Sequence, residues 1–136
     1  MIASLQTRTA AFLNGAPHAV VGASRDRSKY GNKVLRCYLQ AHLPVYAVNP
    51  AGGEMEGLQA FATLSALPER VHGISIITPP GVTERIVEEA HAAGVKHLWM
   101  QPGAESDAAI ERAQSLGMNV IGGDACILVV LGYHEH

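Results

Sequence analysis

The stretch His18-Ala-Val-Val-Gly-Ala-Ser24 decides the fold that this sequence predicts. It is a short apolar run that ends in glycine, which is typical of a parallel strand buried on both faces. Residues 32–42 follow with apolar side chains on one helical face, and Pro44 introduces a second apolar run at residues 45–48. A strand, a helix and a strand in this order predict a βαβ unit.

The rest of the chain repeats the same alternation. Three more apolar runs predict strands, at residues 71–78, 95–100 and 119–121. Helical patterns separate them at residues 82–93 and 105–116, and shorter helices are expected within residues 1–15 and 125–131. Residues 58–68 are weakly patterned, as one short strand or turn plus a short helix. We therefore expect an α/β, Rossmann-like three-layer sandwich with a five-stranded parallel sheet in the order 3-2-1-4-5.

Length and composition limit the classes of protein. The 136 residues fit a single domain over residues 1–136, and 48% hydrophobic against 16% charged residues predicts a packed core. A net charge of -2 lacks the basic excess that nucleic acid or anionic lipid attracts, so neither is an expected partner. Without a membrane-span pattern, a leader or a metal-ligand motif, we expect a cytoplasmic protein with no metal site.

The loop after the first strand is the strongest candidate for a binding site. Ligands of open α/β sheets bind beyond the carboxyl ends of the strands, where the strand order reverses. Gly22 and Ala23 allow a close approach of the backbone, Ser24 offers a hydroxyl, and the next helix directs free N–H groups into the same space. We therefore expect an anion site, and expect Gly22→Val to block it without unfolding the domain.

Cations in this loop favour the same interpretation. Arg25, Arg27 and Lys29 lie within six residues of one another. The alternative is a plain solvated turn, which the basic cluster and the position at the switch point disfavour.

The end of the second strand bears on the choice of ligand. Nicotinamide and flavin dinucleotides normally need an acidic side chain there, about 20 residues beyond the glycines, to hold the adenosine ribose. This chain has Asn49 and Pro50 instead. Because no carboxylate would repel a phosphorylated ribose, coenzyme A is the expected cofactor, and NADP fits by the same argument.

Several motifs together resemble one known family. They are Val-Val-Gly-Ala-Ser at 20–24, Lys29 before a glycine, Val48-Asn-Pro, Thr78-Pro-Pro, Leu98-Trp-Met-Gln-Pro-Gly103 and Asp124-Ala-Cys126. In order and spacing, over residues 16–131, the chain resembles the stand-alone CoA-binding domain family. That family is similar to the N-terminal domain of the succinyl-CoA synthetase α subunit, and its first Rossmann loop binds the CoA pyrophosphate.

The resemblance implies roles for individual residues. The phosphates would contact residues of the first loop, namely Gly22, Ala23, Ser24 and Lys29, with Arg25 and Tyr30 beside them. The remaining contacts would come from Asn49 and Pro50 at the adenosine, Thr78, Pro79 and Pro80 at the pantetheine arm, and Trp99 and Gln101 in the neighbouring wall. The chain departs from the family at His72, where aspartate is usual, and at Ala125, where arginine is usual, so no role is carried over to the C-terminal motif.

Two classes of function stay open. In the first, the chain binds CoA or acyl-CoA as a non-catalytic carrier, sensor or partner subunit, with a second copy or a partner enzyme as its protein partner. In the second, it is a small NADP-binding oxidoreductase or regulator, or a fragment of an acyl-CoA ligase. We expect no catalytic residue, because the sequence shows no proton-donor pair for a reductase and no second domain with a phosphorylated histidine for a ligase. Two interpretations also stay open for Trp99, core packing or base stacking, and for Cys126, a structural or a reactive thiol.

Overall fold

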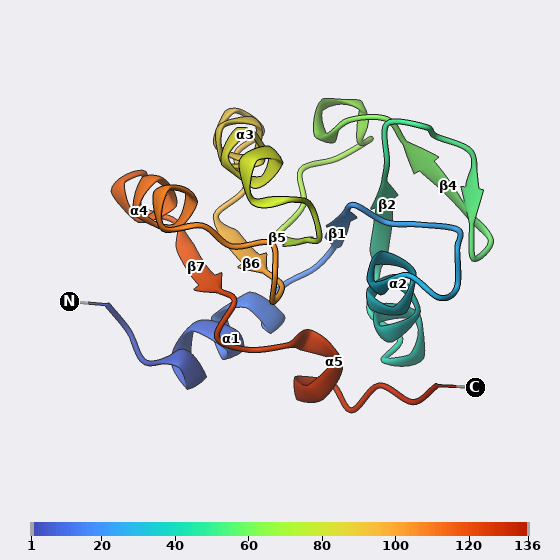
Figure 1. Cartoon of the computed structure of the whole chain (residues 1–136), viewed down its shortest axis with the longest axis horizontal. Helices are drawn as coiled ribbons and strands as arrows, with labels where there is room; N and C mark the ends of the chain where they lie inside the picture. Colours follow the sequence, from blue (N-terminus) through green and yellow to red (C-terminus); the bar gives the residue numbers. More distant parts are fainter. Residues whose placement is uncertain (1, 136) are drawn as a thin grey trace.

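A computed structural model describes residues 2–135 as one mixed sheet between two layers of helices (Figure 1). The strands are β1 (His18–Val21), β2 (Val45–Val48), β3 (Glu54–Met55), β4 (Leu58–Phe61), β5 (Gly73–Ile76), β6 (His97–Met100) and β7 (Asn119–Gly122). Their order is β3-β4-β2-β1-β5-β6-β7, and every neighbouring pair is parallel except β3 and β4.

The predicted five-stranded order 3-2-1-4-5 is wrong, although the α/β class and the dominance of parallel strands are confirmed. We expected residues 71–78 to form the third strand, at the outer side of β2. Instead β4 pairs with β2 there, through Ala47 with Ala60 and Val48 with Phe61, while β5 lies on the other side of β1. The weakly patterned segment therefore holds the missing strand, and the switch point lies between β1 and β5.

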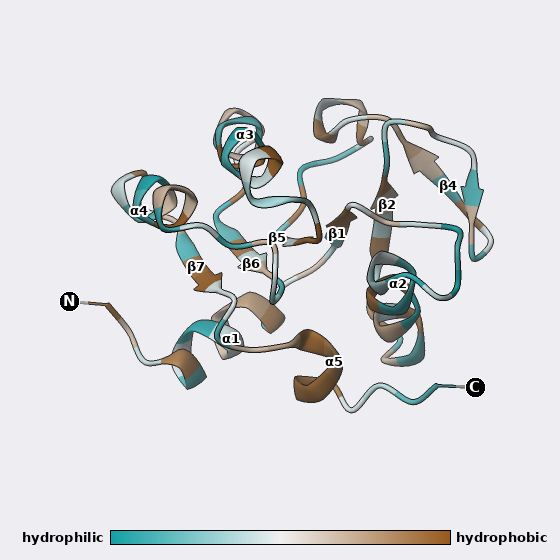
Figure 2. Ribbon diagram, in the orientation of Figure 1, coloured by the Kyte–Doolittle hydropathy of each residue, from teal (hydrophilic) through white to brown (hydrophobic). Residues whose placement is uncertain are grey.

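Helices cover both faces of the sheet. They are α1 (Leu5–Leu13), α2 (Tyr30–Gln40), α3 (Pro80–Ala92), α4 (Asp107–Ser115) and α5 (Ile127–Val130), with a 3-10 turn, η1 (Leu64–Ala66). Side chains of α3 and α4 pack with one face of the strands, and those of α1, α2 and α5 pack with the other. Coloured by hydropathy, β1 and α5 are among the most hydrophobic elements (Figure 2).

Local signals explain where the helices begin and end. The hydroxyl groups of Ser4 and Ser106 accept hydrogen bonds from the amides of Thr7 and Ala109, which caps α1 and α4. Gly94 follows α3 with a φ of +78°, a left-handed conformation that commonly ends helices and favours glycine. Within residues 2–135, every helix is too short or too polar to cross a bilayer.

Three histidines join α1 to the amino-terminal edge of the sheet. The ring of His72 lies 4.1 Å from that of His97 and 5.7 Å from that of His18, between ring centroids. Nε2 of His18 and Nε2 of His72 face the carbonyl oxygens of Phe12 and Ala11 in α1. These histidines therefore have a packing role at the edge opposite to the expected binding site.

Candidate functional site

The loops that follow β1 and β2 meet at the carboxyl edge of the sheet, because the strands before them are parallel and in register. They enclose a cleft of about 380 Å³. Its lining combines the first loop, the start of α2 and the ends of β2 and β5, through Gly22, Ala23, Ser24, Lys29, Tyr30, Gly31, Asn49 and Ile77. The structure thus brings together six of the residues that the sequence analysis assigned to the phosphates and the adenosine.

The backbone at Gly22 turns sharply out of β1. Its φ is +96°, a left-handed conformation that favours glycine, and its amide donates to the carbonyl oxygen of Val48 at 3.1 Å. A Cβ here would collide with the carbonyl oxygen of Ile77. The expectation that Gly22→Val leaves the fold intact is therefore wrong, since the new side chain would meet backbone before it met a ligand.

The first turn of α2 faces this cleft. Lys29 is the N-cap residue, and no side chain caps the helix. The amide of Asn32 donates to the carbonyl oxygen of Lys29, so those of Tyr30 and Gly31 are left for a ligand or for water, and the helix dipole favours an anion there. Gly31 allows the helix to begin this close to the first loop, because a Cβ at Gly31 would collide with the carbonyl oxygen of Gly22.

Asn49 joins the two loops. Its Nδ2 donates to the carbonyl oxygen of Ala23 at 2.7 Å, and its Oδ1 accepts from the amide of Ala51 at 2.8 Å. The side chain is therefore engaged within the protein. An aspartate here would set a carboxylate oxygen against the carbonyl of Ala23, which would disturb the loop as well as any ligand.

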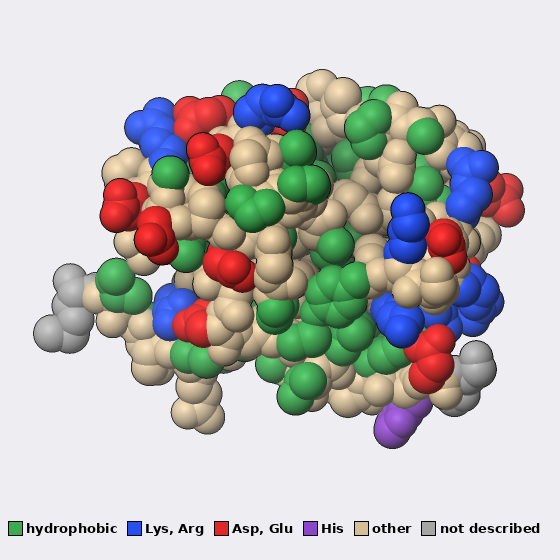
Figure 3. All heavy atoms as spheres, viewed as in Figure 1, with side chains coloured by type: hydrophobic (Ala, Val, Ile, Leu, Met, Phe, Trp, Pro, Cys, Tyr) green, Lys and Arg blue, Asp and Glu red, His purple; other side chains and the backbone are tan. Residues whose placement is uncertain are grey.

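The cations of the first loop differ in their surroundings. Nη2 of Arg25 donates to the carbonyl oxygen of Gly52 at 3.1 Å, across the loop after β2. Arg27 pairs with Glu56 at 3.5 Å, while Lys29 is exposed and lines the cleft. Figure 3 shows basic side chains, with a few acidic ones, on the side of the molecule that carries α2 and this loop.

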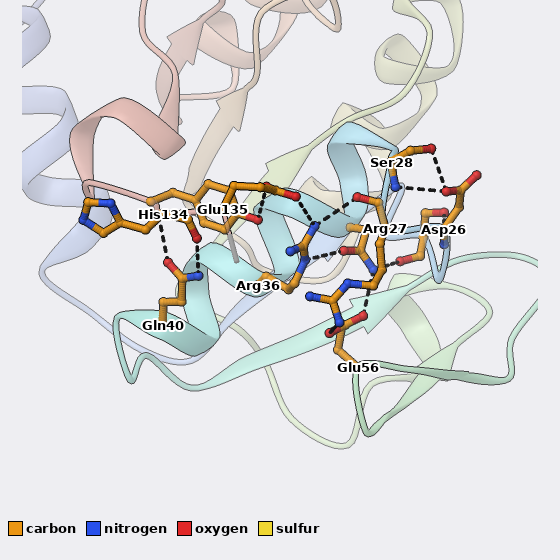
Figure 4. A network of polar contacts seen from close by, with 11 residues as sticks. Asp26, Arg27, Ser28, Arg36, Gln40, Glu56, His134 and Glu135 are labelled. Atoms are coloured by element: carbon orange, nitrogen blue, oxygen red, sulfur yellow. Dashed lines mark hydrogen bonds and ion pairs between the residues drawn. The ribbon is translucent and has the colours of Figure 1, made fainter.

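A polar network that the sequence analysis missed supports the loop from behind (Figure 4). Asn32 donates through Nδ2 to the carbonyl oxygen of Ser24 at 2.9 Å and to Glu56 at 3.1 Å. Buried Arg36 donates to Oδ1 of Asn32 at 2.7 Å and to the carbonyl oxygen of Arg27 at 2.9 Å. The loop is thus fixed in shape by α2 and by the turn between β3 and β4.

Tyr30 connects the cleft to the interior. Its hydroxyl contacts Sγ of Cys126 and donates to Oε1 of Gln101 at 3.3 Å. Gln101 is fully buried, and its Oε1 also accepts from the amide of Ile127. Burial, with the bond to Cys126 as the second cause, raises the pKa of Tyr30 well above its usual range, so the phenol stays neutral near pH 7.

The remaining predicted residues lie in three places. Trp99 is fully buried, and its Nε1 donates to the carbonyl oxygen of Ala125 at 2.9 Å, so it packs in the core instead of lining the cleft. Pro50 and Thr78 meet in a neighbouring hollow of about 300 Å³ that reaches the cleft at Gly22. Exposed Pro79 and Pro80 begin α3, as its N-cap and first residue.

Known proteins are similar to this chain in sequence. Residues 17–132 match the family described as CoA binding domain. The chain is 27% identical over 114 residues to an ADP-forming acetate–CoA ligase of Archaeoglobus fulgidus, and 27% identical over 122 residues to the α subunit of such a ligase from Pyrococcus furiosus. These matches cover 76% and 82% of the chain, but only 17% and 27% of the two relatives.

A solved structure of similar size is also similar to this chain in sequence and fold. A conserved hypothetical protein from Pyrococcus furiosus is 39% identical, with a TM-score of 0.78. The match covers 83% of this chain and 97% of that protein. The family match spans most of the sequence, so the chain belongs to the CoA-binding domain family.

Proposed function

We propose that the chain binds coenzyme A or an acyl-CoA with the pyrophosphate in the cleft between the first loop and α2. The observation that carries this proposal is the uncapped start of α2 at Lys29, which faces a cleft lined by Gly22 and Ser24. Open amides, a hydroxyl and an ammonium group together form a suitable environment for a pyrophosphate. Membership of the CoA-binding domain family supports CoA as the source of that pyrophosphate.

We further propose a non-catalytic role, as a carrier, sensor or partner subunit. Among the cleft-lining residues that the structure describes, the ionisable side chains are those of Lys29 and Tyr30. The raised pKa of Tyr30 leaves it without the ionised form that a general base needs. The chain spans about a sixth to a quarter of the length of the curated ligases it matches.

Calorimetry on the full chain tests the binding proposal. CoA should bind with an affinity that falls as salt concentration rises, because the contacts to phosphate are charged and partly exposed. Lys29→Gln should weaken CoA by about tenfold, the usual scale for loss of one charge-assisted hydrogen bond. Lys96→Gln removes the same charge from the opposite edge of the sheet and should leave the affinity unchanged.

The ligand panel should include NAD and NADP. NADP is the second candidate because the cation of Arg25 beside the loop after β2 suits a phosphorylated ribose. Equal or tighter binding of NAD than of CoA would overturn the proposed function.

A further inference from the structure

The side chain of Arg25 crosses from the first loop to the loop after β2. Its Nη2 donates to the carbonyl oxygen of Gly52, and a Cβ at Gly53 would collide with the same nitrogen. Gly53 therefore leaves room for a guanidinium group at the carboxyl end of β2, and the carbonyl oxygen of Gly52 holds it there. In Rossmann-like folds this is the position at which the adenosine ribose is recognised.

The other polar groups near this position are occupied by protein contacts. Asn49 uses Nδ2 on Ala23 and Oδ1 on Ala51. Glu56 accepts from Arg27 and from Asn32, and its side chain is only 18% exposed. Both side chains are held in bonds that shape the loops, so they are less free than Arg25 to turn toward a ribose.

The three nearby arginines differ in how far their guanidinium groups are already bonded within the protein. Arg27 is paired with Glu56, and Arg36 is buried against Asn32. Arg25 is exposed, and among residues 2–135 its one hydrogen-bond partner is the carbonyl oxygen of Gly52. Most of the N–H donors of its guanidinium group are therefore open, in the fork geometry that binds phosphate well.

We propose that Arg25 determines specificity for the ligand by binding the phosphate on its adenosine ribose. This inference rests on the proposed function, in which that group is the 3′-phosphate of CoA. The 2′-phosphate of NADP offers the same chemistry at a neighbouring ribose position, so the test includes both pairs of ligands.

The test compares ligands that differ by this single phosphate. The affinities of the full chain for CoA and dephospho-CoA, and for NADP and NAD, are measured by calorimetry. We expect the unchanged chain to bind CoA at least about tenfold more tightly than dephospho-CoA, the scale of one charge-assisted contact. Arg25→Gln should bring that ratio close to one by weakening CoA alone, and Arg25→Lys should restore part of it.

Arg27→Gln is the matched control, since it removes an equal charge from the same loop. It should change the affinities for CoA and dephospho-CoA by the same factor and leave their ratio as it was. Circular dichroism checks that each variant is folded, and the exposed position of Arg25 favours this.

The outcomes separate the two proposals. If CoA and dephospho-CoA bind the unchanged chain equally well, or if Arg25→Gln keeps the preference, Arg25 does not bind the ribose phosphate, while CoA binding stands. If neither CoA form binds but NADP binds better than NAD, the proposed function fails, and the effect of Arg25→Gln on that pair decides the role of Arg25. If none of the four ligands binds, both proposals fall.

Discussion

Nε2 of His18 lies 2.9 Å from the carbonyl oxygen of Phe12, and the two rings stack with their centroids 4.7 Å apart. Since a carbonyl oxygen only accepts, Nε2 carries the hydrogen and Nδ1 is bare. This Nδ1 is buried without a hydrogen-bond partner among the described residues. A second proton on the ring would therefore place an unpaired charge in the core.

Acid should destabilise the fold through this group of histidines. Burial lowers the pKa of His18 and of His97, and the neighbouring His72 lowers both further, although the bond to Phe12 opposes the shift of His18. The unfolded chain binds these protons below a pH of about 6.5, and the native chain only at lower pH. The free energy of unfolding should therefore fall as the pH drops below about 6.5, by at most about 1.4 kcal/mol per pH unit for each histidine.

Urea unfolding between pH 5 and pH 8 measures this dependence, with the single tryptophan, buried Trp99, as the fluorescent reporter. His97→Gln can still accept from Asn119 and should flatten the pH profile. His91→Gln removes an exposed histidine from α3 and should leave the profile unchanged. If His97→Gln and His91→Gln show the same pH dependence of stability, that dependence does not arise from the buried histidines.

Gly31→Ala should cost stability, because the new methyl group meets the carbonyl oxygen of Gly22 and the start of α2 would have to move. Overpacking of this kind typically costs about 1–3 kcal/mol. Gly81 offers a matched control in the first turn of α3, where a Cβ would have open space. Gly81→Ala should change stability little, or raise it by up to about 1 kcal/mol through helix propensity. Equal effects of the two substitutions in chemical denaturation would argue against the close approach.

The two members of the ion pair between Arg36 and Glu135 should differ in importance. Glu135 is 55% exposed, so Glu135→Gln should change the free energy of unfolding little. Arg36→Ala also leaves the carbonyl oxygen of Arg27 and Oδ1 of Asn32 without their donor, and should cost about 3 kcal/mol or more. Thermal unfolding compares the two variants. A similar loss of stability in both would show that Arg36 stabilises the fold mainly through its ion pair with Glu135.

Gln101→Leu tests the support of the cleft from below. The substitution removes the acceptor of the buried amide of Ile127 and of the Tyr30 hydroxyl, as well as a bond to Ser75. Unsatisfied groups of this kind cost about 1–3 kcal/mol each. Chemical denaturation measures the loss of stability. CoA affinity should also fall, because Tyr30 lines the cleft. Unchanged stability would mean that water takes over the hydrogen bonds of the Gln101 side chain.

Local patterns in the sequence predicted the elements around the cleft but not the order of the strands. The apolar run before Gly22 and the helix after it are short-range features, and both are found where they were expected. The position of β4 depends on two register pairs with β2, which no local pattern encodes. The turn between β3 and β4 also lacks the Asn-Gly or Asp-Gly pair that usually marks a hairpin. Its two residues are Glu56 and Gly57, and Glu56 takes a left-handed φ of +48°.

The composition of the first loop could likewise be read from the sequence, but the partners of its cations could not. Arg25 and Arg27 are two residues apart, yet one reaches Gly52 and the other Glu56. Asn49 could be placed at the end of β2, but its engagement with Ala23 depends on how two loops distant in sequence come together. Such contacts depend on tertiary structure.

The packing of α1 on the sheet has a consequence for aggregation. Open strand edges can pair with other molecules, and this chain closes both of its edges. At one edge Arg8 donates to the carbonyl oxygen of Val120 at 2.9 Å, and Asn119 donates to that of Arg8. At the other, β3 is only two residues long and carries the exposed charge of Glu54. A chain shortened to begin after Leu13 would present β7 as a free template, so the first helix protects the molecule from joining its sheet to that of a neighbour.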